Sequence, residues 1–67
     1  MKNRLKELRA RHNITQQELA TNVGVSRQSI NAIENGDTTP AGDTMLKIAN
    51  YFNMNASEVF ELNEKEV

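Results

Sequence analysis

TQQELATNVGVSRQSINAIENG, residues 15–36, is the stretch of this sequence that decides its fold. It opens with Thr15 and Glu18, a spacing at which each side chain can accept a hydrogen bond from the backbone N–H of the other and so cap the start of a helix. Gly24 ends that helix, because glycine adopts a left-handed backbone conformation at little steric cost. The first part of the stretch therefore predicts a short helix that ends in a tight turn of Gly24 and Val25.

A second short helix follows the turn. Ser26 is a favourable N-cap for a helix over residues 27–34. The small side chain of Ala20 allows the two helices to approach closely. The inward residues of both helices and of the turn are Leu19, Ala20, Val23, Val25, Ile30 and Ile33. Two short helices that cross at a steep angle are therefore predicted.

Apolar periodicity predicts further helices on either side of this pair. A helix over residues 2–12, with Leu5 and Leu8 on one face, precedes it, and a helix over residues 43–52 follows it. The segment between, residues 37–42, holds turn-forming residues and the only proline, so it is expected to be a surface loop. The apolar set of the later helix is Met45, Leu46, Ile48, Ala49 and Phe52.

A last short helix is predicted near the end of the chain. Asn55 and Glu58 form a capping pair for a helix that ends at about Glu61. No alternating run is long enough for a strand. The expected fold is all-α, a compact bundle of about five short helices in a single domain over all 67 residues. Residues 2–61 are expected to be its ordered core, and residues 62–67 a frayed tail.

The composition excludes several classes of site. The chain has no cysteine and one histidine, so disulfides, thiolate zinc sites and cysteine nucleophiles are excluded, and no metal or other cofactor is expected. No apolar stretch is long enough for a signal peptide or a membrane span, which predicts a cytoplasmic protein with no membrane partner.

The charge is distributed unevenly along the chain. The net charge is −1, but residues 1–36 carry six basic and three acidic side chains (+3), whereas residues 37–67 carry two and six (−4). Ordinary solvated surface would account for this, and so would a protein with one side that faces DNA.

The outward face of the helix over residues 27–34 is rich in groups that pair with base edges. Arginine can form two hydrogen bonds with guanine, and glutamine or asparagine can do so with adenine. The residues on or near this face are Arg27, Gln28, Ser29, Asn31 and Ala32. A solvated surface would look similar, but the spacing of the turn favours the DNA interpretation.

The runs TQQELA, VGVS and RQSINAIENG, followed by PAGDTMLKIANYF, resemble the Cro/C1-type (XRE-like) helix-turn-helix regulators of phages and bacteria. The resemblance covers about residues 2–61. It implies a lambda-repressor-like bundle of four or five helices, whose third helix lies in the major groove of double-stranded DNA. It also implies operator binding, often as a homodimer on a palindrome, and no small-molecule ligand is expected.

The resemblance also implies a role for each matching residue. The base-contacting residues are Arg27, Gln28, Asn31 and Ala32, with the first two leading. The phosphate-contacting residues are Gln16, Ser29, Asn35, Thr38 and Thr39. Gln16 is further expected to brace the first recognition residue. Arg9 and Glu34 are expected to form an internal salt bridge between the first and third helices.

One departure from the family concerns the loop after the third helix. Phage relatives often carry basic residues there, whereas this chain has Asp37, Thr38, Thr39 and Pro40. Weak electrostatic help from this loop predicts a modest salt dependence of DNA binding.

The leading functional hypothesis is a sequence-specific transcriptional regulator, and more specifically a repressor that acts by occupying its operator. The alternative is a protein-binding module, such as an antitoxin or an antagonist of another regulator. An enzyme ranks third, because no residue pattern resembles an active site. A homodimer is expected at least on DNA. The residues expected to form its surface are Tyr51, Met54, Phe60 and Leu62.

Overall fold

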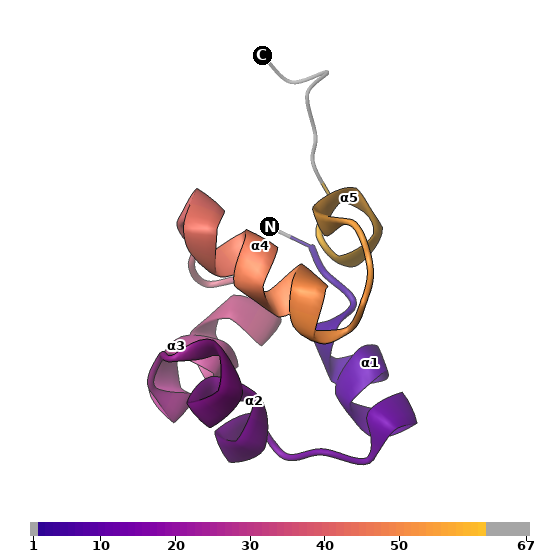
Figure 1. The fold of residues 1–67 in the computed structure, drawn as a ribbon. Coiled ribbons are helices and arrows are strands. Elements are labelled where there is room, and N and C mark those ends of the chain that lie inside the picture. Colours follow the sequence, from indigo (N-terminus) through magenta and orange to yellow (C-terminus); the bar gives the residue numbers. More distant parts are fainter. Residues whose placement is uncertain (1, 62–67) are drawn as a thin grey trace.

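The computed structural model describes residues 2–61, and the predicted frayed tail lies outside this range. Five helices follow one another along the chain (Figure 1): α1 (Leu5–His12), α2 (Gln16–Val23), α3 (Arg27–Glu34), α4 (Gly42–Tyr51) and α5 (Ala56–Val59). Helices α2 and α3 pack against each other, and α4 packs against α2 and α5. The prediction of an all-α bundle of five short helices is confirmed.

Local side-chain chemistry sets the ends of α2 and the start of α3. The Thr15 hydroxyl accepts from the Glu18 N–H at 3.0 Å, and the Glu18 carboxylate accepts from the Thr15 N–H at 2.9 Å, so the predicted capping box is present. Gly24 ends α2 with φ of 78°. The Ser26 hydroxyl accepts from the Ser29 N–H at 3.1 Å and caps α3. Each of these contacts joins residues close in sequence, which is why they were predictable.

All five helices contribute to one apolar core. Helix α3 turns Ile30 and Ile33 inward, into the same buried cluster as Leu19 of α2 and the Leu5 and Leu8 side chains of α1. The buried apolar residues of the whole core are Leu5, Leu8, Leu19, Ala20, Val23, Ile30, Ile33, Ile48, Ala49, Phe52, Val59 and Phe60. Among the described residues no polar or charged residue is buried as a whole. The core therefore holds α3 through the buried apolar side chains on its inner face, Ile30 and Ile33.

The two ends of the described chain differ from the prediction. Helix α1 begins at Leu5 rather than Lys2, because the segment before it is extended and pairs with the segment after α5. The Arg4 N–H donates to the Val59 carbonyl, and the Glu61 N–H donates to the Lys2 carbonyl, both at 2.9 Å. The same pairing makes the chain extended after Val59, so α5 ends two residues earlier than predicted.

Helix α4 also differs in part from the prediction. It begins at Gly42 and ends at Tyr51, one residue earlier at each end than predicted. Leu46, which the apolar pattern assigned to the core, is 57% exposed. Pro40 is buried, so the loop before α4 is anchored at its proline instead of lying wholly on the surface. Burial here depends on how α4 crosses its neighbours, which periodicity within α4 does not specify.

The residues predicted to form a dimer surface do not share one environment. Phe60 is 1% exposed, so its inclusion in that surface was wrong, because the side chain completes the protein's own core. Tyr51 is 38% exposed, and Met54 is partly buried against the core. Leu62 lies outside the described residues.

Candidate nucleic-acid interface

The turn between α2 and α3 sets the angle at which α3 leaves α2. The Gly24 and Val25 N–H groups both donate to the Ala20 carbonyl, at 2.9 and 3.0 Å. Gly24 holds φ of 78°, a value that a residue with a Cβ adopts only under strain. A Cβ added at Gly24 would meet no atom within 4 Å, so crowding by neighbouring atoms is not what requires glycine. The left-handed backbone conformation is what requires it.

We expect Gly24→Ala to lower the free energy of unfolding by about 1–2 kcal/mol, because alanine must hold the left-handed conformation. Urea unfolding followed by circular dichroism measures the change. Gly42→Ala is the matched control, since a Cβ there also meets no atom within 4 Å and the residue is the first of α4. Equal losses in the two variants would contradict the role given to the left-handed turn.

The outer face of α3, defined as Arg27, Gln28, Ser29, Asn31 and Ala32, carries the residues predicted to read DNA. Ala32 is partly buried and the other four are exposed. Ser29 is engaged locally, since its hydroxyl accepts from the Ser26 hydroxyl at 2.9 Å. Within residues 2–61 the Arg27 and Gln28 side chains form no hydrogen bond. The ends of both side chains are therefore available to an external partner.

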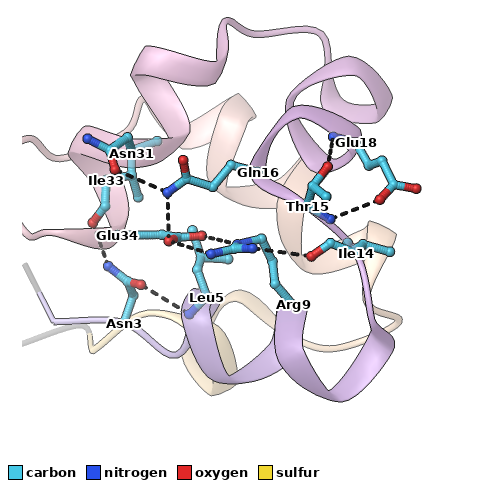
Figure 2. Close-up of polar contacts among 10 residues, drawn as sticks. All are labelled: Asn3, Leu5, Arg9, Ile14, Thr15, Gln16, Glu18, Asn31, Ile33 and Glu34. Atoms are coloured by element: carbon cyan, nitrogen blue, oxygen red, sulfur yellow. Dashed lines mark hydrogen bonds and ion pairs between the residues drawn. The ribbon is translucent and has the colours of Figure 1, made fainter.

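Beneath this face, a buried ion pair ties α3 to α1 (Figure 2). Arg9 donates through Nε to Glu34 Oε2 at 2.5 Å and through Nη2 to Glu34 Oε1 at 3.0 Å. It also donates through Nη1 to the Ile14 carbonyl at 3.2 Å. The Glu34 side chain is 1% exposed and that of Arg9 is 17% exposed. The hydrogen bonds to Glu34 hold the pKa of the Arg9 guanidinium above its ordinary value.

Gln16 extends this arrangement from α2 to the outer face of α3. Its Nε2 donates to Glu34 Oε1 and to Asn31 Oδ1, both at 3.1 Å. Gln16 thus contacts Asn31, in the second turn of α3, where the prediction was that it would brace the first recognition residue. Both amide hydrogens of Gln16 are used in these two bonds. A phosphate contact from Gln16 would therefore come from its backbone N–H.

Asn3 supports the far end of α3, a role that sequence reasoning missed. Its Nδ2 donates to the Ile33 carbonyl at 2.7 Å, and its Oδ1 accepts from the Leu5 N–H at 3.1 Å. Figure 2 shows this side chain between the start of α1 and the end of α3. Because Asn3 and Ile33 are 30 positions apart, no local pattern pointed to the contact.

The remaining predicted phosphate contacts lie after α3. Asn35 is the C-terminal cap of the helix, and Gly36 follows in a left-handed conformation with φ of 79°. The Asp37 N–H donates back to the Ala32 carbonyl at 2.9 Å, which closes the turn. Thr38 and Thr39 follow on the exposed surface. Both threonines come after the C-terminal end of α3. Gln16, by contrast, is the first residue of α2 and contacts Asn31 in the second turn of α3.

Between residues 2 and 61, no three histidine, aspartate or glutamate side chains come together to hold a metal ion. No helix in this range is long and apolar enough to cross a membrane.

The arrangement of two short helices around a glycine turn matches a known family. The helix-turn-helix family model matches residues 5–59, which is most of the chain. This protein belongs to the Cro/C1-type helix-turn-helix family. The resemblance inferred from the sequence is thereby confirmed, and the lambda-repressor-like fold with it.

Similar sequences occur in bacteria and archaea. The chain is 48% identical over 65 residues to the uncharacterized HTH-type transcriptional regulator YgzD of Bacillus subtilis, covering 97% of this chain and 98% of that protein. It is 46% identical over 66 residues to an uncharacterized HTH-type transcriptional regulator of Methanocaldococcus jannaschii, covering 98% of this chain and 100% of that protein. The family to which the chain belongs is thus one of transcriptional regulators.

Two solved structures share the fold. The restriction-modification controller protein C.AhdI of Aeromonas hydrophila aligns with a TM-score of 0.78 and 30% identity, covering 85% of this chain and 86% of that one. The DNA-binding domain of the P22 C2 repressor aligns with a TM-score of 0.75 and 28% identity, covering 81% of this chain and 71% of that one.

Proposed function

We propose that this protein binds double-stranded DNA sequence-specifically, with α3 in the major groove. The observation that carries the proposal is the outer face of α3. Arg27 and Gln28 are exposed there without a side-chain hydrogen bond to residues 2–61, while the helix beneath them is held by the buried Glu34 carboxylate. A rigid helix with unused base-pairing groups is what direct readout of a groove requires.

In this proposal different residues contact the bases and the phosphates of the DNA. Arg27 and Gln28 lead the base contacts, Asn31 adds a further one, and Ala32 packs against a thymine methyl. Phosphate contacts position the helix without selecting sequence. The proposed phosphate contacts come from the backbone N–H of Gln16 and from Ser29, Asn35, Thr38 and Thr39.

Gel-shift titration of Arg27→Ala against the DNA upstream of the gene that encodes this protein tests the proposal. We expect the unmodified protein to retard this DNA and the variant to bind it about 5- to 150-fold more weakly, since one base-pairing residue contributes about 1–3 kcal/mol. Thermal stability should not change, because Arg27 is exposed. If the unmodified protein gave no retardation at low salt but formed a stable protein complex in a pull-down, it would act as a protein-binding module instead.

We further expect a shallow dependence of DNA affinity on salt. Between residues 2 and 36, the part of the described chain with a net positive charge, three basic side chains lie outside ion pairs. They are Lys2, Lys6 and Arg27. The others are paired, since Arg4 and Arg11 contact Glu7 at 3.1 and 2.9 Å and Arg9 contacts Glu34. The hydrogen bond from Arg4 lowers the pKa of the Glu7 carboxyl.

If Lys2, Lys6 and Arg27 are the cations that neutralise phosphates, the slope of log affinity against log salt is no steeper than about −3 per protomer. Fluorescence anisotropy at several salt concentrations measures this slope. A much steeper slope would mean that the paired arginines are released to bind phosphates.

Repression by operator occupancy, as a homodimer on a palindrome, completes the proposal. A protein seated on a promoter blocks polymerase without any further contact, and the similarity to the P22 C2 repressor domain supports this reading. Tyr51 and Met54 remain in the proposed dimer surface, together with Leu62, which lies outside the described residues. Two protomers would place their α3 helices about 34 Å apart, one helical turn of DNA. A stoichiometry of one protomer per operator by sedimentation would rule the dimer out.

A further inference from the structure

Asn31 differs from the two leading base-contacting residues in how its side chain is held. Gln16 Nε2 donates to Asn31 Oδ1 at 3.1 Å, so a residue of α2 holds a side chain on the outer face of α3 (Figure 2). The Arg27 and Gln28 side chains, by contrast, form no hydrogen bond within residues 2–61. One exposed residue of the outer face is therefore restrained from a neighbouring helix, and two are not.

The other hydrogen bond of Gln16 anchors this contact to the ion pair between α1 and α3. The same Nε2 atom donates to Glu34 Oε1 at 3.1 Å, and Arg9 donates to both oxygens of that carboxylate. Because an ionised carboxylate only accepts, the Gln16 NH₂ group must face it. The Glu34 side chain is 1% exposed, so a reversed amide would place its oxygen against a charge that water does not screen. The Gln16 amide is therefore held in one orientation.

The anchored Gln16 amide restrains Asn31 and leaves it able to pair with a base. Asn31 Oδ1 faces Gln16 and accepts one hydrogen bond, which leaves its second lone pair. Figure 2 shows the NH₂ group of Asn31 on the side away from Gln16, and neither of its hydrogens is bonded within residues 2–61. An acceptor and a donor are the groups with which asparagine pairs with adenine. The contact therefore removes rotational freedom from Asn31 before DNA binds.

We propose that Gln16 is the positioning residue for Asn31, so that the two side chains act as one unit when Asn31 contacts its base; this rests on the proposed function. A side chain that is already held loses little freedom on binding, which is worth about 2- to 10-fold in affinity. Arg27 and Gln28 have no such restraint and are ordered by the DNA itself. Removing the Gln16 side chain should therefore affect one base pair and spare the others.

Affinity measurements on four proteins test this: the unmodified chain, Gln16→Ala, Asn31→Ala and the double variant. The duplex is the best sequence that the unmodified protein selects from a random pool. We expect Gln16→Ala to bind it about 2- to 10-fold more weakly, and the double variant to bind no more weakly than Asn31→Ala alone. The proposed phosphate contact does not interfere, because alanine keeps the backbone N–H of residue 16.

A second readout separates positioning of Asn31 from a general loosening of α2 and α3. Asn31→Ala identifies the base pair that Asn31 contacts, as the position at which selection from the random pool loses its preference. Selection with Gln16→Ala should weaken the preference at that base pair and keep it at the others. Loss of preference at every position would mean that Gln16 only holds the two helices together, and would overturn the inference.

Gln17→Ala is the matched control, because Gln17 neighbours Gln16 but its amide donates to Thr21, at 3.1 Å. We expect a small effect that multiplies with the effect of Asn31→Ala. The inference fails, with DNA binding intact, if the losses of Gln16→Ala and Asn31→Ala also multiply in the double variant. It fails equally if Asn31→Ala changes neither affinity nor preference. If the unmodified protein enriched no sequence at all, both proposals would fail.

Discussion

Arg9→Ala is expected to lower the free energy of unfolding by about 3 kcal/mol or more, which is the typical cost of leaving a buried charge without its partner. The Glu34 carboxylate is 1% exposed, and Gln16 would remain as its only other side-chain donor within residues 2–61. A chain of 67 residues has a total stability of only about 3–10 kcal/mol, so this loss would remove about a third of it or more. Urea unfolding of the purified variant measures the loss.

Arg11→Ala is the matched control for this prediction. Arg11 also contacts a glutamate, Glu7, but the two side chains are 60% and 51% exposed. Exposed ion pairs contribute at most about 1 kcal/mol, so this variant should unfold at nearly the same urea concentration as the unmodified protein. A double-mutant cycle of Arg9 and Glu34 completes the test. A coupling energy near zero would show that the pair does not hold α1 and α3 together.

Leu19→Ala is expected to be equally damaging, for a different reason. Leu19 is 0% exposed and lies in α2 at the centre of the core. Removing its side chain loses buried apolar surface and leaves a cavity, at a cost of about 2–5 kcal/mol. Thermal unfolding by circular dichroism should show the loss as a large fall in Tm.

Leu46→Ala makes the same chemical change at an exposed position of α4, where the leucine is 57% exposed. It should change the stability by less than about 0.5 kcal/mol, as is usual for surface substitutions. Comparable losses at Leu19 and Leu46 would mean that Leu46 is covered in solution, for example by a partner.

Most of the fold was predictable from contacts between residues near in sequence. The capping box of Thr15 and Glu18, the left-handed Gly24 and the Ser26 cap each involve residues at most three positions apart, and all were anticipated. The order of the helices followed from apolar periodicity. These features depend on local backbone geometry, which sequence spacing specifies.

The predicted site was accessible to sequence reasoning only in part. That residues 27–34 form a helix with Ile30 and Ile33 inward implied which side chains lie on its outer face. The sequence did not indicate that Gln16 would contact Asn31, because a bond between residues 15 positions apart depends on the crossing of α2 and α3. The direction of that bond depends further on a carboxylate contributed by the last residue of α3 and an arginine from α1.

The sequence by itself determined the helix ends, the glycine turn and the polar face of α3, since these follow from the conformational and capping preferences of neighbouring residues. Only the tertiary structure decided which way Asn31 points, that Phe60 is buried, and that the segment before α1 pairs with the segment after α5. The physical reason is the same in each case. These features join residues distant in the chain, and their energies exist only after the helices have packed.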